Sequence, residues 1–202
     1  MSTYIAGFSL GLSLILAIGS QNAFVLKQGL KKRHVFIVCL VCAVSDALLI
    51  SLGVSGFGTV VKQFPTIEIV ARYGGAAFLT IYALLSFKSA FTQSHALEAE
   101  AEAETESSLF RTIAICLAFT WLNPHVYLDT VILLGSVSTQ YHPEQFQFAL
   151  GAVIASFVFF FSLGYGARVL APVFENPKAW KVFEFFVGII MLALALSLVA
   201  NV

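Results

Sequence analysis

Charged residues are scarce in this sequence. Only 11% of the 202 residues are Asp, Glu, Lys or Arg, whereas 59% are hydrophobic. Because soluble globular domains carry about 25% charged residues, this composition excludes an ordinary soluble fold. The mean hydropathy of +0.91 indicates an integral membrane protein. Basic and acidic residues balance to a net charge of zero, so the composition gives no reason to expect a nucleic-acid partner.

Several chemical signatures are also missing. The chain has no Gly-rich phosphate-binding loop, which argues against an ATP-driven pump. Its three cysteines, Cys39, Cys42 and Cys116, lie in apolar runs without a neighbouring His, so we interpret Cys39 and Cys42 as packing residues rather than a metal or redox site. No basic residue precedes the first apolar run, because Lys27 follows it; we therefore expect that run to stay in the mature protein. We expect neither a metal nor a cofactor.

Long apolar runs dominate what is present. A hydrocarbon core of about 30 Å needs about 20 apolar residues per helix, and six runs meet this requirement. The sequence therefore predicts an all-α membrane protein with six transmembrane helices. The predicted spans are Ile5 to Leu26, Val35 to Gly56, Ile67 to Phe87, Ile113 to Leu134, Phe146 to Val169 and Val182 to Val199.

The basic residues predict the orientation. Nine of the 11 lie in or beside the loops after spans one, three and five, whereas only Lys62 and Arg72 lie at the other end. The positive-inside rule places the nine in the cytoplasm, so both termini are predicted to lie outside. The nine are Lys27, Lys31, Lys32, Arg33, Lys88, Arg111, Arg168, Lys178 and Lys181.

A run of alternating Glu and Ala divides the chain. Residues 93–109 form the predicted acidic cytoplasmic connector within a single transporter domain, 1–202, and separate a first three-helix half, 1–92, from a second, 110–202. With three spans in each half, related halves would enter the membrane from opposite sides, which predicts a 3+3 inverted repeat. Asn22 and Asn123 occupy the first span of each half, although the same offset places Asp46 on Gln147, so the match does not extend further.

Polar residues interrupt spans one and four. Irregular backbone in a membrane is tolerated only where protein or a wet cavity satisfies the freed backbone groups. One break alone is equally well explained as an ordinary kink, but two breaks in corresponding spans favour a binding site. The predicted break residues are Gly19, Ser20 and Pro124, and the polar residues beside them are Gln21, Asn22 and Asn123.

Two aspartates lie deep in predicted spans. Asp46 is in the middle of span two and Asp129 is well inside span four, with no Lys or Arg at comparable depth. A charged side chain there costs about 2.5 to 3.5 kcal/mol. Either the two are protonated or bonded to hydroxyls such as those of Ser45 and Thr130, or they bind a cation, protons, or both in turn.

Helical spacing groups these residues. His125, Asp129 and Ser136 fall on one face of span four, and Asp46 shares a face of span two with Gly53. His125 is either a second titratable group in a proton path or a passive hydrogen-bond partner. Small residues on the Asp46 face allow another helix to approach closely.

Three segments resemble a known family. "GSQNAFVLKQGLKKR", "CAVSDALLI" and "TWLNPHVYLDTVILLGS" are similar, in order, to signature segments of the lysine exporter (LysE) family, particularly its arginine-exporter branch. The resemblance implies an exporter of basic amino acids in the bacterial cytoplasmic (inner) membrane, with functional roles for Asp46, Asp129, Asn123 and Pro124. One departure is Ser20, where members usually carry Pro.

We therefore expect a transporter, not an enzyme, that exports L-arginine, L-lysine or both. Asp46 and Asp129 would bind the positive groups, and amides freed at the breaks would bind the carboxylate. Export of a cation against an inside-negative potential needs a counter-ion, so we expect proton coupling and alternating access.

The alternative is an exporter of neutral amino acids or another small cation. An intramembrane aspartyl protease is disfavoured because its Gly-x-Gly-Asp motif is absent. Small residues in spans three and five, including Gly75 and Gly164, permit a homodimer.

Overall fold

The computed structural model describes residues 2–16, 19–57, 65–92 and 109–200, and these residues form helices and short connections without a strand. Most of the predicted connector and Lys62 lie outside the described residues. Helices are expected in lipid, because each one satisfies its own backbone hydrogen bonds. The elements are α1 (Ser2–Ile15), α2 (Ser20–Leu30), α3 (Val35–Leu52), η1 (Gly53–Phe57), α5 (Pro65–Thr92), α7 (Leu109–Trp121), α8 (Pro124–Val126), η2 (Tyr127–Leu133), α9 (Leu134–Ser138), η3 (Thr139–Tyr141), α10 (Gln145–Phe174) and α11 (Pro177–Ala200).

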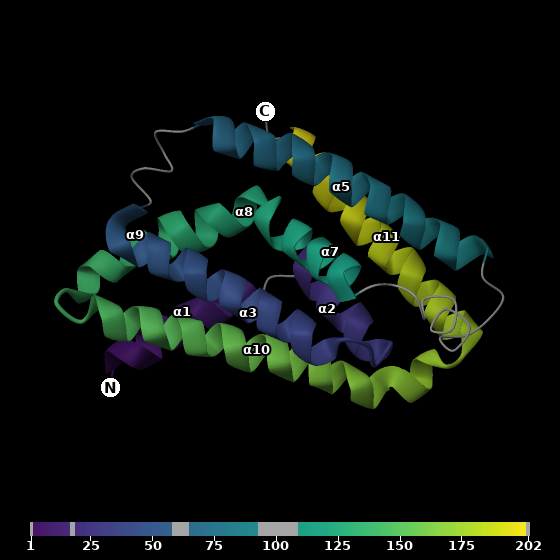
Figure 1. Ribbon diagram of the computed structural model, residues 1–202, viewed down its shortest axis with the longest axis horizontal. Helices are drawn as coiled ribbons and strands as arrows, with labels where there is room; N and C mark the ends of the chain where they lie inside the picture. Colours follow the sequence, from purple (N-terminus) through teal and green to yellow (C-terminus); the bar gives the residue numbers. More distant parts are fainter. Residues whose placement is uncertain (1, 17–18, 58–64, 93–108, 201–202) are drawn as a thin grey trace.

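The long helices form two groups with the interrupted segments between them (Figure 1). Helices α5 and α11 pack along each other on one side, and α1, α3 and α10 pack together on the other. The short helices α2 and α7 contact each other and connect the two groups, because α2 also contacts α10 and α11 and α7 also contacts α3 and α5. The interrupted segments therefore lie inside the bundle.

The helices reproduce the predicted class but not the full count of spans. Four described helices are long and apolar enough to cross a membrane, and a fifth span is obtained if α1 and α2, bent by 83° to each other, are taken as one. The predicted span Ile113 to Leu134 is divided among α7, α8 and η2, and α7 is only 13 residues long. The all-helical membrane class is confirmed, whereas the sixth span stays a prediction.

The distribution of polarity is the reverse of that in a soluble protein. Large apolar side chains such as Phe110 and Val169 are more than three-quarters exposed, whereas Gln21, Asp46 and Glu184 are buried. A continuous apolar exterior is the surface that lipid covers. The polar residues inside therefore have to satisfy one another or a ligand.

Small residues allow the helices to approach closely. A Cβ atom added to Gly53 would lie 2.6 Å from the carbonyl oxygen of Thr130, and one added to Gly135 would lie 2.5 Å from the carbonyl oxygen of Gly53. This crossing holds the end of α3 against η2 and α9. Gly164 is similarly occupied, because an added Cβ would lie 2.5 Å from Cys39 Sγ. Its small size serves packing within the chain, and the predicted homodimer stays a prediction.

The cysteines also take part in helix packing. The Cys39 thiol donates to the Phe160 carbonyl oxygen at 3.1 Å, and the Cys42 and Cys116 sulfurs lie 3.3 Å apart. All three thiols are free and buried. Cys42 faces Cys116 of α7 rather than Cys39, so both cysteines of the Cys-x-x-Cys segment make contacts between helices.

The contact at Gly53 predicts a large effect of a small substitution. Gly53→Ala forces the new methyl group against the Thr130 carbonyl, so we expect it to destabilise the protein by about 1–3 kcal/mol, the usual cost of overpacking. Gly166→Ala is the matched control, because an added Cβ there has nothing within 4 Å and helix propensity favours Ala. Thermal unfolding of both variants in detergent measures the difference; equal stability would show that the crossing is loose.

Candidate functional site

The first interruption lies between α1 and α2. Helix α1 ends at Ile15, and α2 begins at Ser20 after Gly19, whose backbone is extended with φ −118° and ψ 168°. The Asn22 side chain donates from Nδ2 to the Ile15 carbonyl oxygen at 2.8 Å. Asn22 therefore satisfies a carbonyl that the end of α1 leaves without a helical partner. The structure thus places an interruption at Gly19, and Ser20 is the first residue of α2.

The second interruption lies between α7 and α8. Asn123 is extended, and Pro124 occupies the first turn of α8, where a missing amide hydrogen costs nothing. The Asn123 Oδ1 atom accepts from the His125 backbone N–H at 3.1 Å, and the Tyr127 hydroxyl donates to the Trp121 carbonyl oxygen at 2.8 Å. Both Asn residues predicted for substrate binding thus have a side-chain atom engaged in capping the breaks.

A π-helical segment, η2, follows the second break and contains Asp129. Leu134 closes it by donating its backbone N–H to the Asp129 carbonyl oxygen. Its wider turn changes the face on which later residues lie. Ser136 is exposed and does not line the cavity that Asp129 lines, so the predicted common face ends before it. Short π-helical segments are frequent at functional sites.

Both interruptions and both aspartates line one cavity, which we call the polar pocket. Its volume is about 280 Å³, and α1, α2, α3, α5, α8, η2, α10 and α11 contribute to its wall. Eight of the nine predicted site and break residues line it, the exception being Pro124, which is buried beside it. The eight are Gly19, Ser20, Gln21, Asn22, Asp46, Asn123, His125 and Asp129.

Asp46 is the most buried acid of the polar pocket. It is 4% exposed, and its Oδ2 atom accepts from the Ser156 hydroxyl of α10 at 2.9 Å. Ser45, offered by the sequence as a partner, instead accepts from the Trp121 indole N–H at 3.4 Å. Sequence reasoning missed Ser156, because a single Ser in an apolar helix gives no signal of its partner.

Asp129 and Thr130 complete this wall of the polar pocket. Asp129 is half-buried, and the Thr130 hydroxyl donates to the Val126 carbonyl oxygen at 2.5 Å rather than to Asp129. Across the described ranges, no Lys or Arg forms an ion pair with Asp46 or Asp129. In the part of the chain that the structure describes, the pocket therefore combines two carboxyl groups with no Lys or Arg to balance them.

A third buried acid behaves differently. Glu184 of α11 is fully buried, and its Oε1 atom lies 2.5 Å from Lys27 Nζ. The sequence reading did not single out Glu184, and it placed Lys27 at the membrane surface. This pair balances its own charge, so it is a structural contrast to Asp46 rather than part of the same site.

Gln21 supplies an open hydrogen-bond donor. The side chain is 7% exposed and lines the polar pocket, yet its Nε2 atom has no hydrogen-bond partner among the described residues. A buried amide without a partner costs about 1–3 kcal/mol. A ligand oxygen in the pocket would remove this cost.

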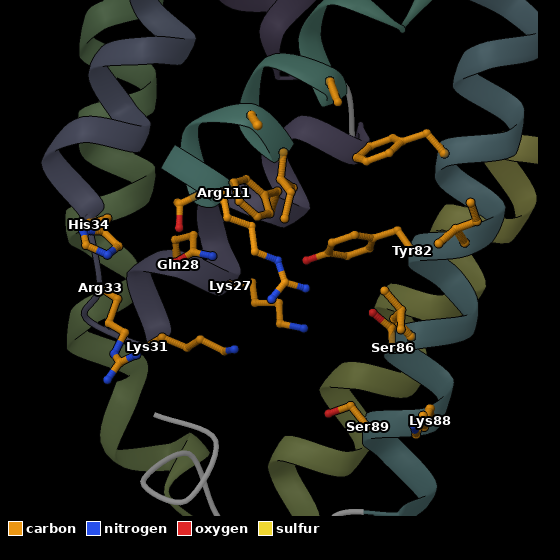
Figure 2. Close-up of a pocket in the computed structure, with 18 residues that line it drawn as sticks. Lys27, Gln28, Lys31, Arg33, His34, Tyr82, Ser86, Lys88, Ser89 and Arg111 are labelled. Atoms are coloured by element: carbon orange, nitrogen blue, oxygen red, sulfur yellow. The ribbon is translucent and has the colours of Figure 1, made fainter. Parts of the chain in front are cut away.

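A second, larger cavity, the vestibule, lies toward the basic end of the bundle (Figure 2). Its volume is about 700 Å³. Phe24, Phe78, Tyr82 and Phe119 form an aromatic cluster between the two cavities, with Phe119 centred 4.8 to 5.1 Å from the other three rings. Along α2 the order is Gln21 in the polar pocket, Phe24 in the cluster and Lys27 in the vestibule.

This arrangement defines a class of protein. A small helical membrane protein with a polar pocket between two interrupted helices has the architecture of a membrane transporter. The chain belongs to the LysE type translocator family, whose pattern matches residues 12–202. It is thus a transporter and not an enzyme, and the family predicted from the three motifs is confirmed.

Relatives cover nearly the whole chain. A protein of Pectobacterium atrosepticum named arginine exporter protein ArgO is 42% identical over 198 residues, 98% of this chain and 96% of its own. One of the same name from Salmonella enteritidis is 40% identical over 199 residues, 98% of this chain and 93% of its own. A Mycobacterium bovis protein provisionally named an amino-acid transporter is 40% identical over 184 residues, 91% of this chain and 90% of its own. No solved structure matches the chain.

The cap at the second break predicts a stability effect that is separable from substrate binding. Asn123→Ala removes the acceptor for the His125 N–H, and loss of an N-cap costs about 1 kcal/mol. Asn123→Ser restores an acceptor of similar reach, so we expect it to regain most of the stability. Thermal unfolding in detergent measures both. If the Ala variant were as stable as the parent protein, the capping role would be wrong.

Proposed function

We propose that this protein exports basic amino acids, L-arginine and L-lysine, from the cytoplasm in exchange for protons. The observation that carries the proposal is the polar pocket, in which Asp46 and Asp129 approach one cavity from two helices without a basic partner among the described residues. Membership of the family and relatives named arginine exporters support it. A cationic substrate would supply the missing positive charge.

The substrate's groups match the walls of the polar pocket. Asp46 and Asp129 would accept from the guanidinium or ammonium groups through charge-assisted hydrogen bonds. The carboxylate would lie at the start of α2, where backbone amides of the first turn have no helical acceptor and Gln21 Nε2 has no partner. A helix N-terminus of this kind favours an anionic group. His125 lines the pocket while remaining exposed, a position from which it would exchange protons with water.

The contacts between helices support six spans arranged as an inverted repeat. Exchanging the halves turns the contact of α1 with α10 into that of α7 with α3, and the contact of α2 with α11 into that of α8 with α5. The pairs α3 with α10 and α5 with α11 map onto themselves. In this scheme α7 to α9 form the interrupted fourth span, the counterpart of α1 and α2.

Orientation follows from the same topology. The turns from α2 to α3 and from α10 to α11, the end of α5 and the start of α7 lie toward one end of the bundle, and the start of α1 and the end of α11 lie away from it (Figure 1). Nine of the ten described Lys and Arg residues lie at or near this end, and the exception is Arg72 near the start of α5. We therefore assign this end to the cytoplasm and the termini to the outside.

Alternating access gives the aromatic cluster a role. In the conformation described, the cluster lies between the polar pocket and the vestibule, which opens at the basic end. Movement of the two halves against each other would part Phe24 from Phe119 and load the pocket from the cytoplasm. The reverse movement would close the cluster and release the substrate outside.

Coupling follows from electrostatics. Moving one positive charge outward costs about 2.3 kcal/mol per 100 mV of inside-negative potential. Protons entering the cell would offset this cost, and Asp46 and Asp129 would carry them when substrate is absent.

The carboxylates provide the first test. Asp46→Asn and Asp129→Asn keep the shape of the side chains but remove the charge, so we expect each to reduce export of labelled arginine at least 100-fold while membrane insertion is unchanged. Glu175→Gln, an exposed acid at the end of α10, is the matched control and should transport normally. Full transport by either Asp variant would contradict the proposal.

Counterflow in proteoliposomes tests the substrate class and the coupling. We expect labelled arginine and lysine to exchange and a neutral amino acid not to. An imposed gradient, acidic on the extracellular side, should accelerate arginine efflux and acidify the lumen. Exchange of the neutral amino acid would favour the alternative, an exporter of neutral substrates, and indifference to the gradient would contradict proton coupling.

A further inference from the structure

The side chains described around the vestibule make it a basic cavity. Five Lys and Arg side chains line it, and no Asp or Glu among the described residues does. They come from α2, the turn after it, the end of α5 and the start of α7, and Figure 2 shows the side chains of Lys27, Lys31 and Arg111 extending toward its centre. The positive-inside rule explains basic residues at this end, but not their convergence on one cavity. The five are Lys27, Lys31, Arg33, Lys88 and Arg111.

Two of these cations are held inside the protein. Lys27 and Lys31 are 8% and 7% exposed, and the Nζ atom of each lies 6.0 Å from the centre of the Trp180 ring. Glu184 lies beside Lys27. Like charges gathered in a medium of low dielectric repel strongly, and among the described residues that line the vestibule, basic side chains outnumber acidic ones.

A buried hydroxyl also points to a ligand. Ser86 of α5 lines the vestibule and is 1% exposed, and its Oγ atom has no hydrogen-bond partner among the described residues. A buried hydroxyl without a partner carries a desolvation cost. An anionic oxygen in the vestibule would accept from Ser86 and from the cations together.

Part of the lining is apolar and continues onto the outer surface of the bundle. Ile81 and Leu85 line the vestibule while remaining 59% and 53% exposed. Phe78 and Ile115 extend this wall inward. A small inorganic anion would use only the basic wall, whereas a molecule with a phosphate and a hydrocarbon chain would use both.

We propose that the vestibule binds an anionic phospholipid of the cytoplasmic leaflet. Its phosphate lies among Lys31, Lys88, Arg111 and Ser86, and an acyl chain follows Ile81 and Leu85 along α5. Basic cavities between helices at this side of a membrane suit such headgroups. The bound phosphate also offsets the positive wall that a cationic amino acid must pass to reach the polar pocket. The assignment of leaflet rests on the proposed orientation, whereas the binding itself does not.

Lipid binding to the purified full-length chain tests this inference without measuring transport. Native mass spectrometry and thermal unfolding in detergent would compare phosphatidylglycerol, phosphatidylcholine with the same acyl chains, and inorganic phosphate. We expect preferential retention of and stabilisation by phosphatidylglycerol. Arg111→Gln and Lys88→Gln should each weaken binding about fivefold, the effect of about one Lys or Arg near an anionic headgroup.

The controls separate a site from general attraction of charge. Lys178→Gln removes an exposed cation at the start of α11 that does not line the vestibule, and it should leave lipid binding unchanged. Lys88 is exposed, so its variant keeps the test valid if Arg111→Gln does not fold. Equal binding of the two lipids, equal stabilisation by inorganic phosphate, or an equal loss in Lys178→Gln would each overturn the proposal.

Discussion

The structure depends on how two interrupted helices satisfy their backbone within an apolar bundle. An unpaired carbonyl or amide in hydrocarbon costs several kcal/mol, and each break supplies its own side chains to avoid it. Asn22 donates to the Ile15 carbonyl, Tyr127 donates to the Trp121 carbonyl, and Asn123 accepts from the His125 amide. Because these bonds are local, the breaks are stable features that leave other polar groups available to the pocket.

The buried carboxyl groups of Glu184 and Asp46 have different partners. Glu184 is balanced by Lys27 within the protein, an arrangement that is costly to break from either side. Asp46 receives only the Ser156 hydroxyl, which does not balance a charge. This difference is the physical basis for our proposal that Asp46 binds a mobile cation, whereas Glu184 belongs to the framework of the protein.

Electrostatic separation is a second consequence of the fold. The polar pocket contains two acids, and the vestibule is lined by five cations. Had these groups met, the two acids would have formed ion pairs with two of the cations, and the polar pocket would have lost its charge. The aromatic cluster around Phe119 separates the acids of the polar pocket from the cations of the vestibule. Each cavity therefore keeps its own charge.

Close packing connects the two halves. Gly53 and Gly135 allow the end of α3 to touch the segment that contains Asp129, and the same helix carries Asp46. Small residues therefore bring the two acid-bearing elements together, a common use of Gly in membrane helices.

Local chemistry in the sequence determined the membrane class, the helical structure and the positions of both breaks, because hydropathy, Gly19 and Pro124 act over a few residues. It also identified the acids of the polar pocket, since a charge in an apolar run is visible without a structure. Only the tertiary structure decided their partners: Ser156 lies 110 residues from Asp46, and Glu184 meets Lys27 across most of the chain. Such pairings depend on which helix faces lie against each other, and a π-helical turn such as η2 changes those faces in a way that a regular helical period does not predict.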